Sequence, residues 1–201
     1  MNFRRALSRS FYDRPVADVA VELLGKLLVR SVDQQVTVGR IVEVEAYLPN
    51  GDPACHAARG KTPGNAMMFG PPGHSYVYPI HSRWCFNAVT EAEGNGCAVL
   101  VRALQPVAGR DVMEERRGRS KDREVACGPG RLCEAMSIER ELNGSDLTKR
   151  ESLWISPGDL EQDEEIFTSP RIGVTSAEEM QLRFCIAGNS FVSGTKAQRG
   201  M

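Results

Sequence analysis

The chain of 201 residues is predicted to fold as a single domain of mixed α+β class on an antiparallel sheet with flanking helices. Short runs with alternating apolar residues, separated by turns rich in Gly and Pro, are typical of antiparallel strands. Apolar residues at helical spacing occur in a few short segments between these runs. No glycine-rich dinucleotide or phosphate-loop motif is present, so the sequence implies no nucleotide cofactor.

The composition is that of a globular protein, with 41% hydrophobic and 25% charged residues. No apolar run approaches the length that spans a bilayer, so no membrane partner is expected. The first ten residues carry three Arg without a following apolar stretch, which argues against a secretion signal. We therefore expect a cytosolic protein whose cysteines are reduced thiols. None of the six cysteines forms a CxxC pair, so no metal site is predicted.

Charge is distributed unevenly along the chain. The formal net charge of −1 is lower than that of many strong nucleic-acid binders. However, the segment 110–123 holds six basic residues, and the segment 161–165 holds four acidic ones. A local basic surface can bind a polyanion while the rest of the molecule is acidic.

The N-terminal region contains one clear helix signal. Residues 1–10 are expected to be flexible. Asp13 is a candidate helix cap, and Pro15 stands where a first turn tolerates proline. Apolar residues then follow at helical spacing from Val16 to Leu24, and Gly25 ends the pattern.

A strand is predicted at 27–32, followed by a turn at 33–35 and a long strand at 36–48. Alternation along the long strand places Val36, Val38, Val42, Val44 and Ala46 on one face and Ile41, Glu43, Glu45 and Tyr47 on the other.

The remaining elements follow from the same signals. A loop rich in Gly and Pro occupies 49–73, and a Gly-Asn-Gly turn lies at 94–96. Strands are predicted at 75–80, 84–90, 97–104, 171–174 and 182–187, and helices at 111–117 and from Pro129 onward.

Glu43, Glu45 and Tyr47 form the first candidate for chemistry. Alternate residues of a strand lie roughly 6.6–7 Å apart, so two carboxylates beside an aromatic ring could perform acid–base work. The alternative is a solvated outer face, which an isolated pattern of this kind more often marks.

The loop that follows adds His56, and the strand at 75–80 adds Tyr76 and Tyr78 on one face. Aromatic rings near a carboxylate suit a flat cationic ligand, because the ring quadrupole attracts cations. Ordinary strand packing is the alternative for each tyrosine taken alone.

A longer pattern is more specific than any of these motifs. The chain contains, in this order, GRIVEVEAYLPNGDPACHAARGKTPGNAMMFGPPGHSYVY, WCFN, CAVLVRALQP, CGPGRLC, SPRIGV and LRFCIAG. Together these runs resemble the alkyladenine (3-methyladenine) DNA glycosylase family. The resemblance covers residues 11–194, which defines one glycosylase domain followed by a short tail at 195–201.

The resemblance implies one domain with a curved antiparallel sheet and a β-hairpin that enters the minor groove of duplex DNA. It implies no cofactor, a monomer, and damaged purines that are flipped from the duplex into a pocket. Stacked bases are unreachable, so the flip is required, and damage lowers its cost.

Individual residues match the family motif at defined positions. Glu45 matches the general base, and Tyr47, His56 and Tyr78 match the residues that stack around the flipped base. Asn87 matches an asparagine that crowds the amino group of normal guanine. The other matches are Arg102 near the catalytic water, Val174 as a backbone contact to that water, and Arg131 close to the DNA backbone, at a helix start. No Lys stands beside Glu45 in the motif, so a lyase step is not expected.

The chain departs from the family pattern after Tyr78. Family members follow this tyrosine with two apolar residues and a tyrosine that wedges into the duplex. Here the segment is one residue shorter, Pro79 indicates an edge or a bulge, and His81 stands at the wedge position. Arg83 and Met68 are the alternatives for that role.

Two further departures concern charge, because Gly64 and Ala187 stand where family members often carry Arg. Weaker phosphate binding is expected as a result.

Two other functions remain open from the sequence. One is a non-catalytic module that binds lesions, and the other is a hydrolase that uses Cys55 and His56 as a metal site or as a nucleophile site.

Overall fold

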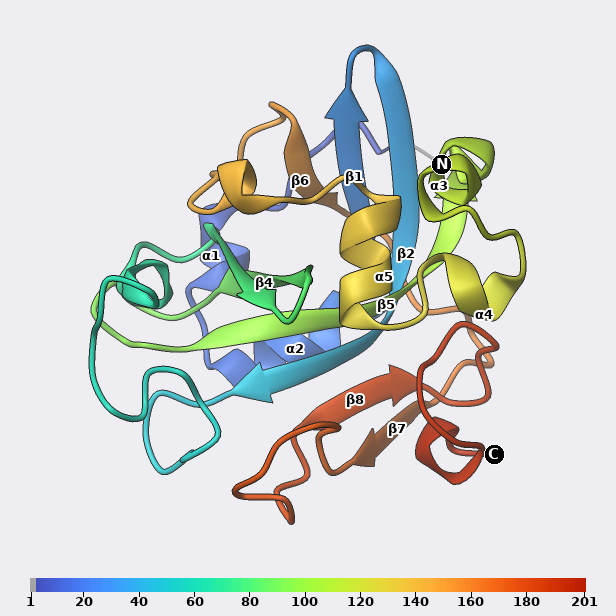
Figure 1. The fold of residues 1–201 in the computed structure, drawn as a ribbon. Coiled ribbons are helices and arrows are strands. Elements are labelled where there is room, and N and C mark those ends of the chain that lie inside the picture. The colour runs from blue at the N-terminus through green and yellow to red at the C-terminus, as the bar shows by residue number, and fades with distance from the viewer. Residues whose placement is uncertain (1–2) are drawn as a thin grey trace.

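A curled antiparallel sheet of eight strands forms the body of the protein in a computed structural model that describes residues 3–201 (Figure 1). Met1 and Asn2, part of the segment expected to be flexible, lie outside the described residues. The strands are β1 Leu27–Val32, β2 Gln35–Tyr47, β3 Ser75–Ile80, β4 Arg83–Val89, β5 Ala98–Ala108, β6 Leu153–Ser156, β7 Ile166–Ser169 and β8 Arg183–Ile186.

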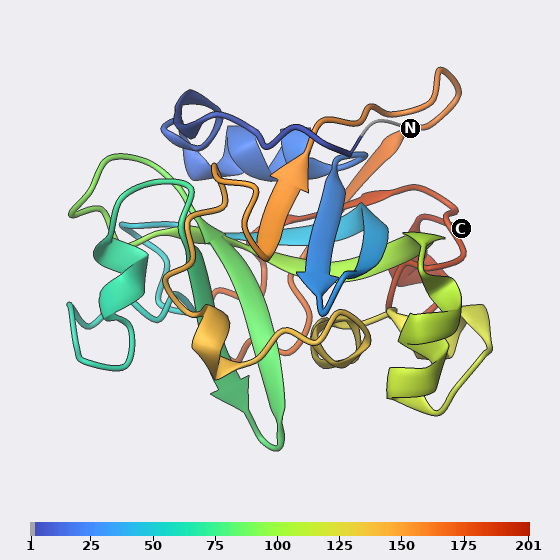
Figure 2. The same cartoon turned by 90° about the horizontal axis from the view of Figure 1, so that it is seen from above.

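The helices are short and lie on both sides of the sheet. The α-helices are α1 Arg9–Tyr12, α2 Val16–Leu23, α3 Arg110–Arg117, α4 Asp122–Val125 and α5 Pro129–Ala135, and single 3₁₀ turns occur at Ala66–Phe69, Arg140–Leu142 and Ala197–Arg199. Figure 2 shows α2 and α5 on opposite sides of the strands. The predicted mixed α+β class on an antiparallel sheet is therefore confirmed.

Strand β2 organises the sheet. The strand order is β3-β4-β5-β2-β1-β6, and β2 also pairs with β8, which pairs with β7. Register shifts against β5 interrupt β2 at Val38/Gly39 and around Glu43. Extra residues in one strand bend it and increase its twist, which curls the sheet. Glu43 and Glu45 pair with β8 on one side and with β5 on the other, so both carboxylates start from the centre of the sheet.

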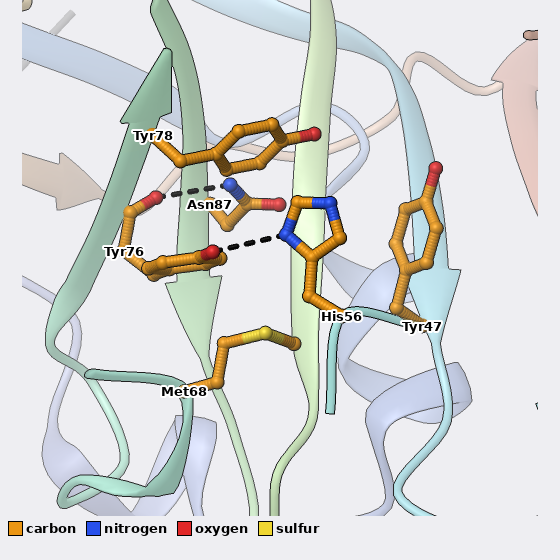
Figure 3. A pocket seen from close by; sticks show the side chains of 6 residues that line it. All are labelled: Tyr47, His56, Met68, Tyr76, Tyr78 and Asn87. Atoms are coloured by element: carbon orange, nitrogen blue, oxygen red, sulfur yellow. Dashed lines mark hydrogen bonds between the residues drawn. The ribbon is translucent and has the colours of Figure 1, made fainter. Parts of the chain in front are cut away.

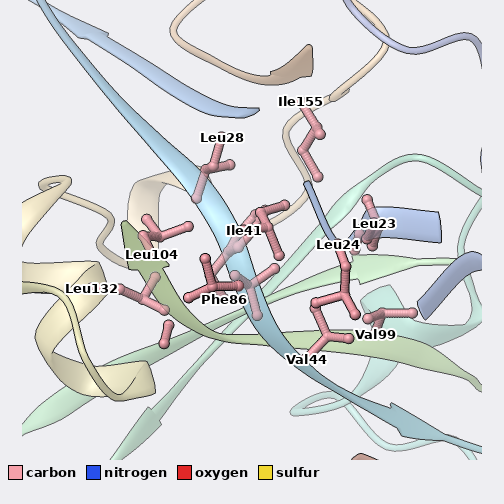
Figure 4. Close-up of a cluster of buried hydrophobic side chains, with 14 of the residues drawn as sticks. Leu23, Leu24, Leu28, Ile41, Val44, Phe86, Val99, Leu104, Leu132 and Ile155 are labelled. Atoms are coloured by element: carbon pink, nitrogen blue, oxygen red, sulfur yellow. The ribbon is translucent and has the colours of Figure 1, made fainter. Parts of the chain in front are cut away.

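The main hydrophobic core joins both helical layers to the sheet (Figure 4). Leu23 from α2, Leu28 from β1, Phe86 from β4 and Leu132 from α5 are all fully buried in it. Burying a side chain of this size contributes about 1.5–3 kcal/mol, so this core fixes the strands that carry the site.

Several elements appear where the sequence predicts them. Helix α2 ends before Gly25, whose φ of +83° is favourable only for glycine. Asp33 and Gln34 form the two-residue turn between β1 and β2, since Val32 pairs with Gln35. Strand β3 has the predicted limits, and Leu132 lies on the buried face of α5.

Other local predictions are wrong. Residues 171–174 form no strand, because the backbone of Ile172 bonds to Glu45 and Arg102 instead of to a neighbouring strand. Asp13 does not cap α2, which starts after Pro15 without a side-chain cap. Ile41 packs in the main core together with Val42, because the register shift after Ile41 breaks the alternation.

Strands β3 and β4 form a tight hairpin that projects from the body (Figure 2). Ile80 pairs with Arg83, so His81 and Ser82 are the whole turn. His81 adopts a φ of +53°, and the tip residues are exposed.

Within the described chain, no helix is both long and apolar enough to span a membrane.

Candidate active site

Glu45 lies at the centre of the candidate site, near the end of β2, and is fully buried. Its Oε1 accepts a hydrogen bond of 2.8 Å from the backbone N–H of Ile172 and lies 3.1 Å from Nη1 of Arg102. Its Oε2 accepts a hydrogen bond of 3.0 Å from the hydroxyl of Tyr47. A carboxylate has about four acceptor positions, so these partners leave room for one further donor.

Glu43, two residues earlier, has a different set of partners. Its Oε1 accepts from Nε of Arg102 at 2.9 Å, Nε of Arg183 at 2.8 Å and the hydroxyl of Ser193 at 2.7 Å. Its Oε2 accepts from the backbone N–H of Ser193 at 2.7 Å. Burial disfavours the charged form, but both guanidinium groups and the Ser193 bonds outweigh it and hold the pKa of Glu43 below its ordinary value.

The two glutamates therefore do not form a solvated outer face. Both are fully buried, and both contact the Arg102 guanidinium. Arg102 comes from β5, the strand paired with β2, and Nη1 also donates to the carbonyl of Ile172 at 3.3 Å. Burial works against its charged form, yet the charges of Glu45 and Glu43 raise the pKa of Arg102, which keeps it cationic.

An aromatic pocket opens beside Glu45 (Figure 3). The imidazole of His56 forms a 2.9 Å hydrogen bond with the Tyr76 hydroxyl through Nδ1. The ring centroid of Tyr78 lies 4.5 Å from that of His56 and 5.3 Å from that of Tyr76. Burial lowers the pKa of His56, so the imidazole is neutral at neutral pH.

Tyr47 faces this cluster from β2 (Figure 3). Tyr47, His56, Tyr78 and Val174 line a cavity of about 410 Å³ that also reaches Ile80 of the hairpin. That volume falls within the usual range for small-molecule sites. The cavity thus has an aromatic wall on each side, as a flat ligand requires.

Asn87 and Met68 close the inner end of the aromatic pocket. The Asn87 amide donates from Nδ2 to the carbonyl of Tyr76 at 2.9 Å, which fixes its orientation. Its Oδ1 therefore faces His56 and the pocket (Figure 3). Met68 is buried in this pocket and is separate from the exposed tip of the hairpin.

Sequence reasoning missed three residues that support the site. The Arg171 guanidinium forms two hydrogen bonds to Asp52, at 2.6 and 2.7 Å, and both side chains are completely buried. Ile172 holds Glu45 through its backbone. The only signal for these residues was their inclusion in two of the motif runs, because no spacing rule connects positions more than a hundred residues apart.

Comparison with known proteins assigns this arrangement to a family. The model of the methylpurine-DNA glycosylase family matches residues 10–190. The chain belongs to this family. It is therefore a DNA glycosylase of base excision repair, and the resemblance identified from the sequence is confirmed.

Individual relatives match over almost the whole glycosylase. A protein of Carboxydothermus hydrogenoformans is 46% identical over 188 residues, which cover 93% of this chain and 98% of the relative. A protein of Methanocella arvoryzae is 48% identical over 179 residues, covering 88% of each chain. Both carry the name "Putative 3-methyladenine DNA glycosylase".

Except for the buried Met68, the residues expected to meet DNA lie around the hairpin of the glycosylase. His81, Arg83 and Arg131 line a second cavity of about 450 Å³, which also reaches Arg102 and Ile172. Arg83 is half exposed, with Nη1 3.9 Å from the Glu134 carboxylate. Ile80, 45% exposed, borders both cavities.

Cys55 and His56 do not form a nucleophilic pair in the glycosylase. Burial raises the pKa of the Cys55 thiol to about 11, so the thiol is protonated at neutral pH. Its sulfur contacts the carbonyl of Gly96, while His56 bonds to Tyr76. This geometry does not support the hydrolase alternative.

Proposed function

We propose that this glycosylase is a monofunctional enzyme that flips alkylated or deaminated purines out of duplex DNA and hydrolyses their N-glycosidic bond. In this proposal Glu45 activates the attacking water and no lyase step follows. The enzyme needs no cofactor and acts as a monomer in the cytosol. The names of its relatives support a 3-methyladenine-type substrate.

The observation that carries the proposal is the difference in hydrogen bonding between Glu45 and Glu43. Glu43 accepts from four donors, three of them at Oε1 and one at Oε2, whereas Glu45 accepts from three donors over its two oxygens. The partners of Glu45 also line the two cavities, Tyr47 on one side and Arg102 and Ile172 on the other. A water bound to Glu45 would therefore lie between the base pocket and the space beside the hairpin.

The chemistry follows from this placement. A purine with a formal positive charge is a good leaving group, so the enzyme has to supply mainly a positioned water and a negative charge. Glu45 takes the proton of the water, and its charge stabilises the oxocarbenium character that develops at the sugar. Arg102 stays cationic and orients Glu45, and Val174 belongs to the loop that borders the water.

The aromatic walls hold the extruded base. Tyr47 stacks on one face, and His56 and Tyr78 contact the other, while Asn87 limits the space for an exocyclic amino group. A neutral His56 adds no repulsion to a cationic purine, since burial lowers its pKa. The hairpin tip with His81 then fills the gap in the duplex, and Arg83 and Arg131 contact the backbone.

A single-turnover assay tests the proposal directly. Purified protein should release free base from a methylated duplex, and Glu45→Gln should reduce the rate at least ~100-fold while it still binds the damaged duplex. Glu22→Gln, in an exposed ion pair on α2, should leave the rate unchanged. Near-normal excision by Glu45→Gln would overturn the mechanism. Binding without any base release by the wild type would instead identify a lesion-binding module.

The absence of a lyase step has its own test. Borohydride should trap no covalent complex between the wild-type protein and DNA, because the proposed mechanism forms no Schiff base. A trapped complex would contradict the monofunctional assignment and leave excision itself intact.

A further inference from the structure

The rear face of the Tyr47 wall is in contact with a buried cation. The central carbon of the Arg171 guanidinium lies over the Tyr47 ring, 4.6 Å from its centroid. The Arg171 side chain is completely buried and lines neither of the two cavities. Because the other face of Tyr47 borders the base cavity, a bound base and Arg171 would lie on opposite faces of the same ring.

The cation is held rigidly in this position. Asp52 accepts both of its strong hydrogen bonds, and the carbonyl of Ala46 accepts a third at 3.0 Å. Asp52 also accepts from the backbone N–H groups of Leu48 and Ala54. Burial opposes its ionisation, but the Arg171 bonds, assisted by these N–H groups, hold the pKa of Asp52 below its ordinary value. The pair is therefore ionised, with its positive end against Tyr47.

A cation on one face of an aromatic ring changes what the other face attracts. The π-face binds cations through its quadrupole, and Arg171 already uses that interaction from behind. A cationic purine on the front face would meet a weaker attraction and the repulsion of the guanidinium through the ring. A neutral purine loses little, because its stacking depends on dispersion and apolar burial.

We propose that Arg171, balanced by Asp52, is a specificity-determining residue that limits the preference of the pocket for cationic purines. This inference rests on the proposed function. Arg171 sets the charge behind Tyr47, and Asp52 sets how much of that charge the bound base experiences. Neutral lesions such as hypoxanthine are thereby excised along with charged ones.

The test compares two lesions in the same duplex, 7-methylguanine as the cationic base and hypoxanthine as the neutral one. Single-turnover rates give the ratio of cationic to neutral excision for each variant. The double variant Arg171→Gln/Asp52→Asn removes both charges and keeps hydrogen-bonding groups, and its ratio should rise about threefold to tenfold. Asp52→Asn alone leaves the cation unbalanced, so its ratio should fall below that of the wild type.

The opposite signs distinguish this role from a structural one. General damage to the pocket would change the ratio in the same direction in both variants. Arg171→Lys keeps the charge but loses the paired hydrogen bonds, so its ratio should stay near the wild-type value even if both rates drop. If Asp52→Asn does not fold, the double variant and Arg171→Lys still give contrasting predictions.

Two failures can be told apart. Ratios within twofold of the wild type in every folded variant would overturn the inference and leave the proposed function standing. If the wild type releases neither base, both the proposed function and the inference are overturned.

Discussion

The floor and the walls of the site consist of different kinds of side chain. The floor is a buried set of carboxylates and guanidinium groups, in which Glu43 and Arg183 are completely buried and nearly every polar atom has a partner. The walls are aromatic rings that border an open cavity. A buried charge network is costly to disturb, whereas a wall residue can change without loss of the fold. Changes in the floor should therefore alter stability or rate, and changes in the walls should alter selectivity.

The largest effect is expected on stability, when the buried charge network of the floor is disrupted at Glu43. Glu43→Gln leaves Arg183 without its carboxylate in the interior and weakens the support of Arg102. Breaking a buried ion pair by removing one partner costs about 3–5 kcal/mol, so the free energy of unfolding should fall by roughly that amount. Urea denaturation followed by circular dichroism measures it, with Glu22→Gln as the exposed control, expected within about 0.5 kcal/mol. A loss as small as that of the control would show that the network contributes little to stability.

The lowered pKa of Glu43 implies that the stability of the protein depends on pH. The folded-state pKa of Glu43 lies below the ordinary glutamate value of about 4.5, so the unfolded chain binds the proton more tightly. The contribution of Glu43 is fully present above about pH 4.5 and is lost as the pH falls below it. The wild type should accordingly lose stability on acidification below this pH more steeply than Glu43→Gln, and equal slopes would contradict the assignment.

The next effect concerns the hairpin at the rim of the walls. If His81 fills the gap left by the flipped base, it replaces stacking worth about 1–3 kcal/mol per base on an aromatic ring. His81→Ala should then lower excision of hypoxanthine more than of 3-methyladenine, by up to about tenfold in the ratio, and His81→Tyr should raise it. Ile80→Ala is the matched comparison, since Ile80 precedes the turn and is also exposed. If only the Ile80 variant changes the ratio, Ile80 is the wedge.

A smaller effect is expected inside the pocket at Asn87. Its amide is fixed by the bond to Tyr76, so the side chain cannot turn away from an incoming amino group. Asn87→Ser shortens the side chain and should raise release of normal guanine relative to hypoxanthine several-fold, in line with roughly 1 kcal/mol of steric discrimination. Asn95→Ser, in the exposed turn after β4, is the control. An unchanged ratio would place the guanine gate elsewhere.

The smallest effect is on salt dependence. Two of the six basic residues in the segment 110–123 pair with carboxylates: Arg110 with Glu114 and Asp122, and Arg117 with Glu134. These pairs reduce the number of cations that can bind phosphates, and Gly64 and Ala187 replace basic residues of the family pattern. We therefore expect a plot of log affinity against log salt to have a slope on the order of −2 to −4. Arg131→Gln should make this slope shallower by about 1, and Arg110→Gln should leave it unchanged. A slope much steeper than −4 would show that the segment does clamp DNA.

The prediction of local elements succeeded where the pattern is carried by neighbouring residues. The helix that ends before Gly25, the turn at Asp33 and Gln34 and the strand at 75–80 all follow from periodicity and turn chemistry. The pattern also placed Glu43 and Glu45 correctly on one strand. Strand β6 was missed, because a four-residue apolar segment carries too little periodicity to be distinguished from a loop.

The sequence alone determined the family, the fold class and the set of candidate residues, because these depend on motifs and on spacing along the chain. Only the tertiary structure decided that Glu43 accepts from four donors and Glu45 from three, and that the partners of Glu45 line both cavities. It also showed that Arg171 lies behind Tyr47 and that the backbone of Ile172 reaches Glu45 across 127 positions. The physical reason is that hydrogen-bond satisfaction and burial depend on contacts between distant segments, which no local pattern records.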